Sequence, residues 1–145
     1  MAVELTANTI QTVEAGQNVL FTDEAVGCNR GYVVHRDGAG IVTLRGVTNG
    51  NCFARYKVAF FGNIGLPAAG TPQTISIALA INGEAIPATT ASDTPATVDR
   101  IFNASTAAFI DVPKGCCYTI AVRNTTVPAE AITVQNANLL IERVA

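Results

Sequence analysis

The sequence predicts an all-β domain in which about ten short strands form a sandwich or a barrel. The best-defined segment, Ile75–Gly83, places an apolar residue at every second position and ends in Asn-Gly, the dipeptide that tight hairpin turns favour. The same period of two recurs along most of the chain, and no segment has the spacing of a long amphipathic helix. With 145 residues, the chain is long enough to form one domain, 1–145, with a substantial core.

The first third of the chain predicts two pairs of short strands. Residues 1–8 are expected to form an N-terminal arm ahead of them. The four expected strands are Thr9–Val13, Gln17–Thr22, Gly31–Arg36 and Ile41–Arg45. Glu14-Ala15-Gly16 separates the first pair, and Asp37-Gly38-Ala39-Gly40 joins the second pair in a hairpin-like connection.

A longer strand is expected from Cys52 to about Phe61. One face carries Cys52, Ala54, Tyr56, Val58 and Phe60, and the other carries Phe53, Arg55, Lys57 and Ala59. Neighbouring side chains of a strand point to opposite faces, so Phe53 and Phe61 cannot share a core with Tyr56 and Phe60. We therefore expect some of these rings at a subunit interface. The candidate interface residues are Phe53, Tyr56, Phe60, Phe61 and Tyr118. The alternative is that bulges direct all of these rings into one core.

The second half continues the pattern with turns at its Gly and Pro residues. The expected strands are Ile75–Ile81, Glu84–Ala88, Thr97–Asn103, Ala107–Val112, Cys116–Asn124 and Ala131–Val144. Leu66–Pro72, Ala91–Pro95 and Thr125–Ala129 are expected to be loops or turns. The inner face of Cys116–Asn124 would carry Cys116, Tyr118, Ile120 and Val122. The last segment changes phase near Asn136–Asn138, which predicts a bulge.

The chain has few charges for its length. Charged residues make up 14 %, hydrophobic residues 49 %, and the net charge is −2. Surfaces of small domains are usually about 25–35 % charged, so we expect part of this surface to be covered by self-association. The alternative is a monomer with a surface rich in Thr, Asn and Gln. No basic patch indicates nucleic acid, and no apolar run approaches a membrane span. The N-terminal residues resemble no secretory signal, so we expect synthesis in the cytoplasm.

The four cysteines leave two interpretations open. They are Cys28, Cys52 and the adjacent Cys116 and Cys117. They are either small buried thiols or include a disulfide, for which Cys28 and Cys52 are the candidate pair. Zinc is not expected, because the spacing lacks paired Cys ligands and the only histidine is His35.

No constellation of residues predicts catalysis or cofactor binding. His35 lies near Asp37, but no Gly-x-Ser-x-Gly nucleophile elbow accompanies them. Several carboxylates are of the type that binds calcium, but no calcium-binding loop motif holds them. They are Asp23, Glu24, Asp37, Asp93, Asp99 and Asp111. We expect no enzyme, no metal and no cofactor, and a hydrolase is the least favoured function.

Four stretches carry a resemblance to a known family. They are Gly16–Phe21, Tyr56–Phe60, Ile77–Glu84 and Ala137–Val144. In them the chain resembles the jelly-roll family of tumour necrosis factor and the globular heads of complement-q proteins. The resemblance is to the bacterial and phage branch, typified by collagen-like spore-surface glycoproteins, although this sequence holds no Gly-X-Y stalk. It implies a jelly-roll β-sandwich that assembles as a compact homotrimer.

The pattern of the whole chain also resembles head decoration or head-fibre proteins of bacteriophages that infect gut bacteria. This resemblance includes Cys116-Cys117 and the closing Asn136–Arg143. It implies a non-enzymatic virion protein that decorates a capsid, with the major capsid protein or another virion protein as partner. The alternative is a receptor- or glycan-binding head domain of a fibre or of a spore or cell-surface protein. The expected loops contain no Trp or Tyr, which favours decoration.

Overall fold

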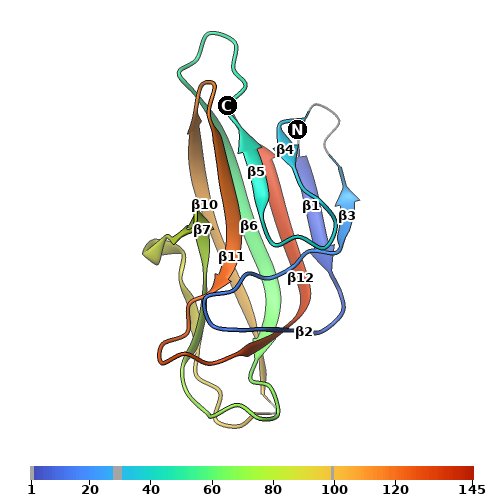
Figure 1. Ribbon diagram of the computed structural model, residues 1–145, viewed down its shortest axis with the longest axis vertical. Helices are drawn as coiled ribbons and strands as arrows, with labels where there is room; N and C mark the ends of the chain where they lie inside the picture. Colours follow the sequence, from blue (N-terminus) through green and yellow to red (C-terminus); the bar gives the residue numbers. More distant parts are fainter. Residues whose placement is uncertain (1, 28–30, 99) are drawn as a thin grey trace.

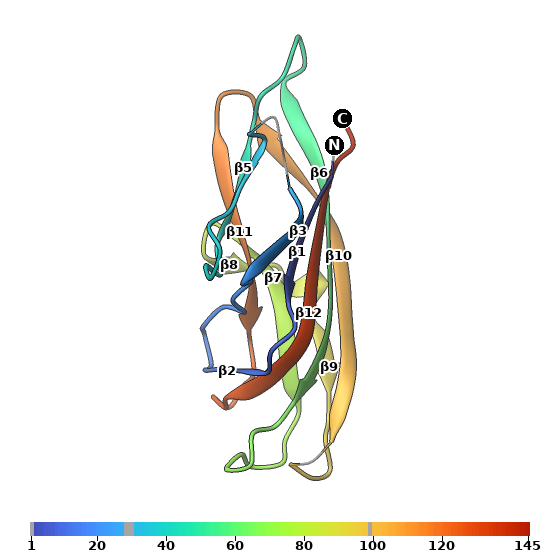
Figure 2. The same ribbon diagram turned by 90° about the vertical axis from the view of Figure 1, so that its right-hand side faces the viewer.

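The computed structural model of the chain describes residues 2–27, 31–98 and 100–145, which form two antiparallel sheets packed face to face (Figures 1 and 2). Sheet 1 has the order β10-β6-β12-β1-β3, with β2 paired to β12, and sheet 2 has the order β4-β5-β11-β7-β8, with β9 paired to β7. Sheet 1 contains β1 (Ala2–Ala7), β2 (Gln11–Val13), β3 (Asp23–Val26), β6 (Phe53–Gly65), β10 (Ile101–Pro113) and β12 (Ile132–Arg143). Sheet 2 contains β4 (Val33–Val34), β5 (Val42–Arg45), β7 (Ile75–Ile81), β8 (Glu84–Ala85), β9 (Ala91–Asp93) and β11 (Cys117–Asn124).

The only helical element in the described ranges is one 3₁₀ turn, η1 (Pro87–Thr89), after β8. The expectation of an all-β sandwich is therefore confirmed. No helix in the described part of the chain is long and apolar enough to cross a membrane.

The core lies between the two sheets and is filled by the inward-pointing side chains of both. Its largest fully buried members are Leu5, Phe21, Leu44, Tyr56, Phe60, Ile64, Ile75, Ile77, Leu79, Ile120, Ile132 and Leu139. The rings of Phe21 and Phe60 meet edge to face, with centroids 6.5 Å apart. The Tyr56 hydroxyl donates to the Arg45 carbonyl at 2.6 Å, so its polar end is satisfied inside the sandwich.

The predicted hairpin after Ile75–Ile81 is present. Asn82 and Gly83 connect β7 to β8 with φ angles of 51° and 86°. Both angles lie in the left-handed region that a two-residue type I′ turn needs, and Asn and Gly tolerate it best. The return strand is shorter than predicted, since β8 ends at Ala85 and η1 follows.

The long strand and its two faces are also confirmed, except that Cys52, predicted on the inner face at its start, is exposed and precedes β6. β6 contains 13 residues and continues to Gly65, four residues past the predicted end. Ala54, Tyr56, Val58 and Phe60 point into the core, while Phe53 and Phe61 are exposed. Because β6 pairs with β10 on one side and β12 on the other, it is a central strand of sheet 1.

The beginning of the chain differs from the prediction of an N-terminal arm. Ala2–Ala7 form β1, which pairs with β12 from Ala2↔Glu142 to Ala7↔Ala137. The alternating Val3, Leu5 and Ala7 are buried, so the strand is held by the core as well as by its backbone. Pairing of the first strand with the last brings both ends of the chain to the same end of the sandwich (Figures 1 and 2).

Three further strand predictions are wrong. Gln17–Thr22 is not a strand: it has one isolated bridge, between Asn18 and Arg123, and scattered backbone hydrogen bonds, although Val19 and Phe21 are buried in the core. The expected loop Ala91–Pro95 contains β9, which pairs with β7. The two expected strands Thr97–Asn103 and Ala107–Val112 are one continuous strand, β10.

The predicted phase change in the last strand is confirmed. The register between β12 and β6 shifts between Gln135 and Asn138. Asn136 has a φ of 54°, which places the extra residue of the bulge in the left-handed region. The bulge lets both halves of β12 bury apolar residues, including Val134 before it and Leu139 after it.

Candidate functional site

The outer face of sheet 1 carries an exposed apolar patch. Phe61 on β6, Leu140 on β12 and Phe109 on β10 are 44 %, 38 % and 66 % exposed. The register places Leu140 opposite Ala59, and Ala59 opposite Ala107, so small residues separate the larger ones. We call the set Ala59, Phe61, Ala107, Phe109 and Leu140 the sheet 1 patch.

A hollow lies within this patch. It has a volume of about 140 Å³ and is lined by Lys57, Ala59, Phe61, Leu140 and Glu142. Lys57 and Glu142 stand opposite each other in the register, so charges of opposite sign border the apolar floor. The apolar lining of the hollow is suited to binding an apolar side chain.

Two further charges of this face, Arg55 and Asp111, neutralise each other. Arg55 donates two hydrogen bonds to the Asp111 carboxylate, at 2.7 and 3.0 Å. This hydrogen bond, more than the Coulomb attraction, lowers the pKa of Asp111 below its usual range. The Arg55 guanidinium also lies 5.0 Å above the Phe53 ring, and a second hollow of about 210 Å³ lies between Arg55, Asp111 and Phe109.

The five interface candidates divide between three environments. Phe53 and Phe61 lie on the outer face of sheet 1, as their position in the strand requires. Tyr56 and Phe60 are fully buried in the core of the single protomer, so their assignment to an interface is corrected. Tyr118 is half-buried on β11 and packs against the core from sheet 2, away from the patch.

The predicted interface residues omit Phe109 and Leu140, and they omit Ala59 although it is predicted on the outer face of its strand. The sequence predicts a short strand, Ala107–Val112, around Phe109 and assigns no face to it. As part of the continuous β10 it shares the outward position with Ala107 and Asp111, directly opposite Lys57. Treating Ile101–Pro113 as one alternating strand would have found it.

β10 is an edge strand of sheet 1. It contains 13 residues and pairs with β6 on one side, while no described strand pairs with it on the other. A long uncovered edge invites pairing or packing with another chain. The edge and the sheet 1 patch are adjacent, because Phe109 and Ala107 belong to both.

The cysteines are mostly exposed. Cys52, Cys116 and Cys117 are free and exposed, so the interpretation of these three as buried hydrophobic thiols is wrong. Cys116 precedes β11 and does not belong to its inner face. Cys28 lies outside the described residues, so its pairing with Cys52 stays a prediction.

Native protein should react with a maleimide at Cys52, Cys116 and Cys117 without denaturant or reductant, because all three thiols are exposed. Peptide mass mapping would identify the labelled positions. Labelling of Cys52 only after reduction would instead establish that it is held in a disulfide.

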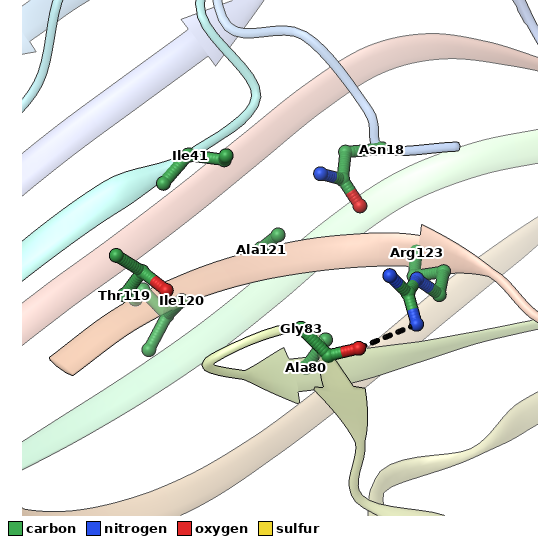
Figure 3. A pocket seen from close by; sticks show the side chains of 8 residues that line it. All are labelled: Asn18, Ile41, Ala80, Gly83, Thr119, Ile120, Ala121 and Arg123. Atoms are coloured by element: carbon green, nitrogen blue, oxygen red, sulfur yellow. Dashed lines mark hydrogen bonds between the residues drawn. The ribbon is translucent and has the colours of Figure 1, made fainter. Parts of the chain in front are cut away.

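A small pocket lies on the outer face of sheet 2, between the β7–β8 hairpin and β11 (Figure 3). Its volume is about 120 Å³, below the roughly 300–1,000 Å³ of typical ligand pockets. Arg123 donates to the Gly83 carbonyl at 2.7 Å. The Asn18 Oδ1 and the Arg123 Nε are buried without a hydrogen-bond partner in the described part of the chain. The described lining contains no carboxylate and no histidine, so it offers no acid–base pair.

His35 lies in a cluster with two carboxylates rather than beside a nucleophile. Its Nε2 lies 3.0 Å from the Ala39 carbonyl oxygen, and none of the described serines bonds to the ring. The fold brings Glu24 and Asp37 to it, with one ligand atom from each of the three residues within 4.8 Å of the others. The remaining carboxylates considered for calcium, Asp23, Asp93 and Asp111, are not part of this cluster. Asp99 lies outside the described residues.

The comparisons with known proteins establish the fold. No protein-family model and no curated protein sequence matches the chain. Solved structures do: the globular domain of zebrafish complement 1qA has a TM-score of 0.68 at 12 % identity, over 99 % of this chain and 97 % of that one. The tumour necrosis factor Eiger from S. frugiperda has a TM-score of 0.70 at 16 % identity, over 100 % and 92 %. Murine APRIL at pH 5.0 has a TM-score of 0.67 at 11 % identity, over 99 % and 98 %. The chain therefore has the jelly-roll sandwich fold of the tumour necrosis factor and complement-q domains.

Proposed function

We propose that this protein is a non-enzymatic structural protein of a bacteriophage virion, a homotrimer that decorates the capsid. The observation that carries the proposal is the sheet 1 patch together with the uncovered edge of β10. Exposed apolar patches of this kind mark interaction surfaces in soluble proteins.

The occupant of the patch is a second copy of the same chain. Phe109 protrudes from β10, and the hollow beside Phe61 and Leu140 has a volume of about 140 Å³. A cavity of about 150 Å³ accommodates a benzene ring, so a phenyl ring fits this hollow. The contact of Phe109 in one copy with the hollow of the next closes into a ring when it is repeated with the right rotation. The same contact made twice across a two-fold axis would give a dimer, so the number three rests on the resemblance to the trimeric tumour necrosis factor and complement-q families.

The charges of the face are suited to burial between copies. Arg55 and Asp111 already form a two-bond pair, so covering them leaves neither charge without a partner. Lys57 and Glu142 offer a second pair of opposite charges at the rim of the hollow. An interface with an apolar centre and a polar, charge-balanced rim is typical of stable assemblies.

The virion role is supported by the resemblance of the whole chain to phage head proteins, including the closing Asn136–Arg143 segment. The low charge content and the missing nucleophile–base pair are consistent with a protein that acts by docking rather than by catalysis. In this proposal, one end of the trimer docks on the capsid shell, and the outer face of sheet 2 in each protomer points away from the trimer axis.

The alternative is a receptor- or glycan-binding head of a fibre, and one observation favours it. The pocket in Figure 3 holds a guanidinium nitrogen and an amide oxygen without protein partners, as a site for a polar ligand would. Its small volume limits such a ligand to a few non-hydrogen atoms.

Particles purified from the infected host distinguish the two functions. We expect the chain to copurify with assembled capsids in many regularly spaced copies, as measured by mass spectrometry of gradient fractions and by cryo-electron microscopy. Location at the tail tip alone, or tight and specific binding of the isolated protein to host cells, would support the fibre head instead.

A further inference from the structure

Three metal-ligating side chains converge at the open edge of the sandwich. Glu24 lies on β3, the edge strand of sheet 1, while His35 and Asp37 lie after β4, the edge strand of sheet 2. Figure 1 shows the connection between β4 and β5 passing beside β3. One ligand atom from each of the three residues lies within 4.8 Å of the others.

The hydrogen bond of His35 sets the state of its ring. A carbonyl oxygen only accepts, so the contact of 3.0 Å to Ala39 requires the hydrogen on Nε2. In the neutral ring this leaves a lone pair on Nδ1, which is buried and has no hydrogen-bond partner among the described residues. Metal-binding histidines almost always donate their second ring N–H to a carbonyl or carboxylate in this way, with the other nitrogen on the metal.

Among the described residues, the two carboxylates also have no ion-pair partner. The ion pair found in the described part of the chain is Arg55–Asp111, far from this cluster in the sequence, and neither Glu24 nor Asp37 accepts a hydrogen bond there. The Glu24 carboxylate folds back over Gly27, into space that any larger residue would fill with its Cβ. Two negative charges held this close repel each other unless a cation lies between them, and the unpartnered Nδ1 of His35 belongs to the same cluster.

The backbone around the cluster is fixed. The Gly38 amide donates to the Phe21 carbonyl at 2.8 Å, and the Phe21 amide donates to the Ala39 carbonyl at 3.2 Å. These bonds tie the β4–β5 connection to the residues that lead into β3. All four side chains of β3 are exposed, so the strand has no apolar anchor of its own.

We propose that Glu24, His35 and Asp37 bind a divalent transition-metal ion of the Zn²⁺ class, which ties the edge of sheet 1 to the edge of sheet 2. One imidazole and two carboxylates suit zinc, with water completing a four-coordinate site. Calcium and magnesium are less well matched, because they prefer sites made of oxygen ligands. The ion would supply the anchor that β3 lacks.

Zinc titration of the chelator-treated, full-length chain tests the site by calorimetry in a reducing buffer. We expect one Zn²⁺ per chain. His35→Ala, Glu24→Gln and Asp37→Asn should each weaken binding at least tenfold. Glu84→Gln removes the same charge from an exposed position on β8 and should leave binding unchanged. Zinc at about a hundredfold excess over its dissociation constant should raise the Tm of the wild type by about 5–10 °C and leave that of His35→Ala unchanged.

Two outcomes would overturn the assignment. Free thiols are zinc ligands in their own right, so the second test replaces all four cysteines by serine, which should preserve the site. Loss of binding in that variant, with retention in His35→Ala, would place the ion on the thiols. Two-dimensional ¹H–¹⁵N spectra of the ring should show Nε2 protonated and Nδ1 shifted by zinc. A ring protonated on both nitrogens and unaffected by zinc would show that the imidazolium itself neutralises the carboxylates.

Discussion

Phe61→Arg is expected to convert the assembled protein into a folded monomer. The substitution places a guanidinium at the wall of the hollow that receives Phe109 of the next copy. Burial of an unpaired charge costs several kcal/mol, more than a small interface can offset. Size-exclusion chromatography with light scattering should report a mass near 15.1 kDa for this variant. Circular dichroism should retain the β-sheet signal, because the Phe61 ring points away from the core.

Phe109→Asp should have the same effect from the other side of the contact. Val34→Arg is the matched control for Phe61→Arg, since it places the same positive charge at an exposed apolar position on β4 in sheet 2. The control should keep the mass of the wild type. Dissociation by Val34→Arg, or persistence of the assembly in both patch variants, would show that the sheet 1 patch is not the interface.

Phe60→Ala is expected to have the opposite consequence, a large loss of stability that arises within the protomer. Phe60 is fully buried and its ring meets that of Phe21 edge to face. Replacement of a buried Phe by Ala typically costs about 3–5 kcal/mol of unfolding free energy through lost burial and the cavity left behind. Urea denaturation at one fixed protein concentration measures it, because stability of an oligomer depends on protomer concentration.

Val34→Ala serves as the control for this measurement. Its side chain is about half exposed, and surface substitutions usually change stability by about 0.5 kcal/mol or less. A cost of Phe60→Ala no larger than that of Val34→Ala would contradict the assignment of Phe60 to the core. Neighbouring rings on β6 thus have separate environments: Phe60 is buried in the protomer, and Phe61 is exposed on the face proposed to join protomers.

The strands that alternate regularly could be predicted from the sequence. Ile75–Ile81, the two faces of β6 and the bulge in β12 all followed from the period of two, since a side chain on the wrong face would lose its burial. The Asn82-Gly83 turn followed from the dipeptide itself, because Asn and Gly tolerate the positive φ angles that the structure has there.

The remaining elements depend on long-range contacts that local pattern does not contain. Gln17–Thr22 has the pattern of a strand, but only its first residues bond to β11, through the Asn18–Arg123 bridge and its flanking backbone hydrogen bonds. The long strand β6 pairs with one continuous strand, β10. The two predicted strands Thr97–Asn103 and Ala107–Val112 therefore contribute to a single strand.

In the candidate sites, too, some features follow from the local sequence pattern and others depend on long-range contacts. The outward position of Phe61 followed from parity, whereas its proximity to Leu140 depends on the pairing of β6 with β12. Glu24 and His35 are brought together by backbone bonds between Phe21 and the residues Gly38 and Ala39. No spacing motif records such a contact, and a sequence with one histidine gives no signal for zinc.

The mass of the wild-type protein in solution tests the central claim most directly. Light scattering at micromolar concentration should give about three times 15.1 kDa, near 45 kDa, because the sheet 1 patch and the β10 edge are covered by neighbouring copies. A mass of 15.1 kDa at that concentration would contradict the proposed assembly, and with it the trimeric decoration protein.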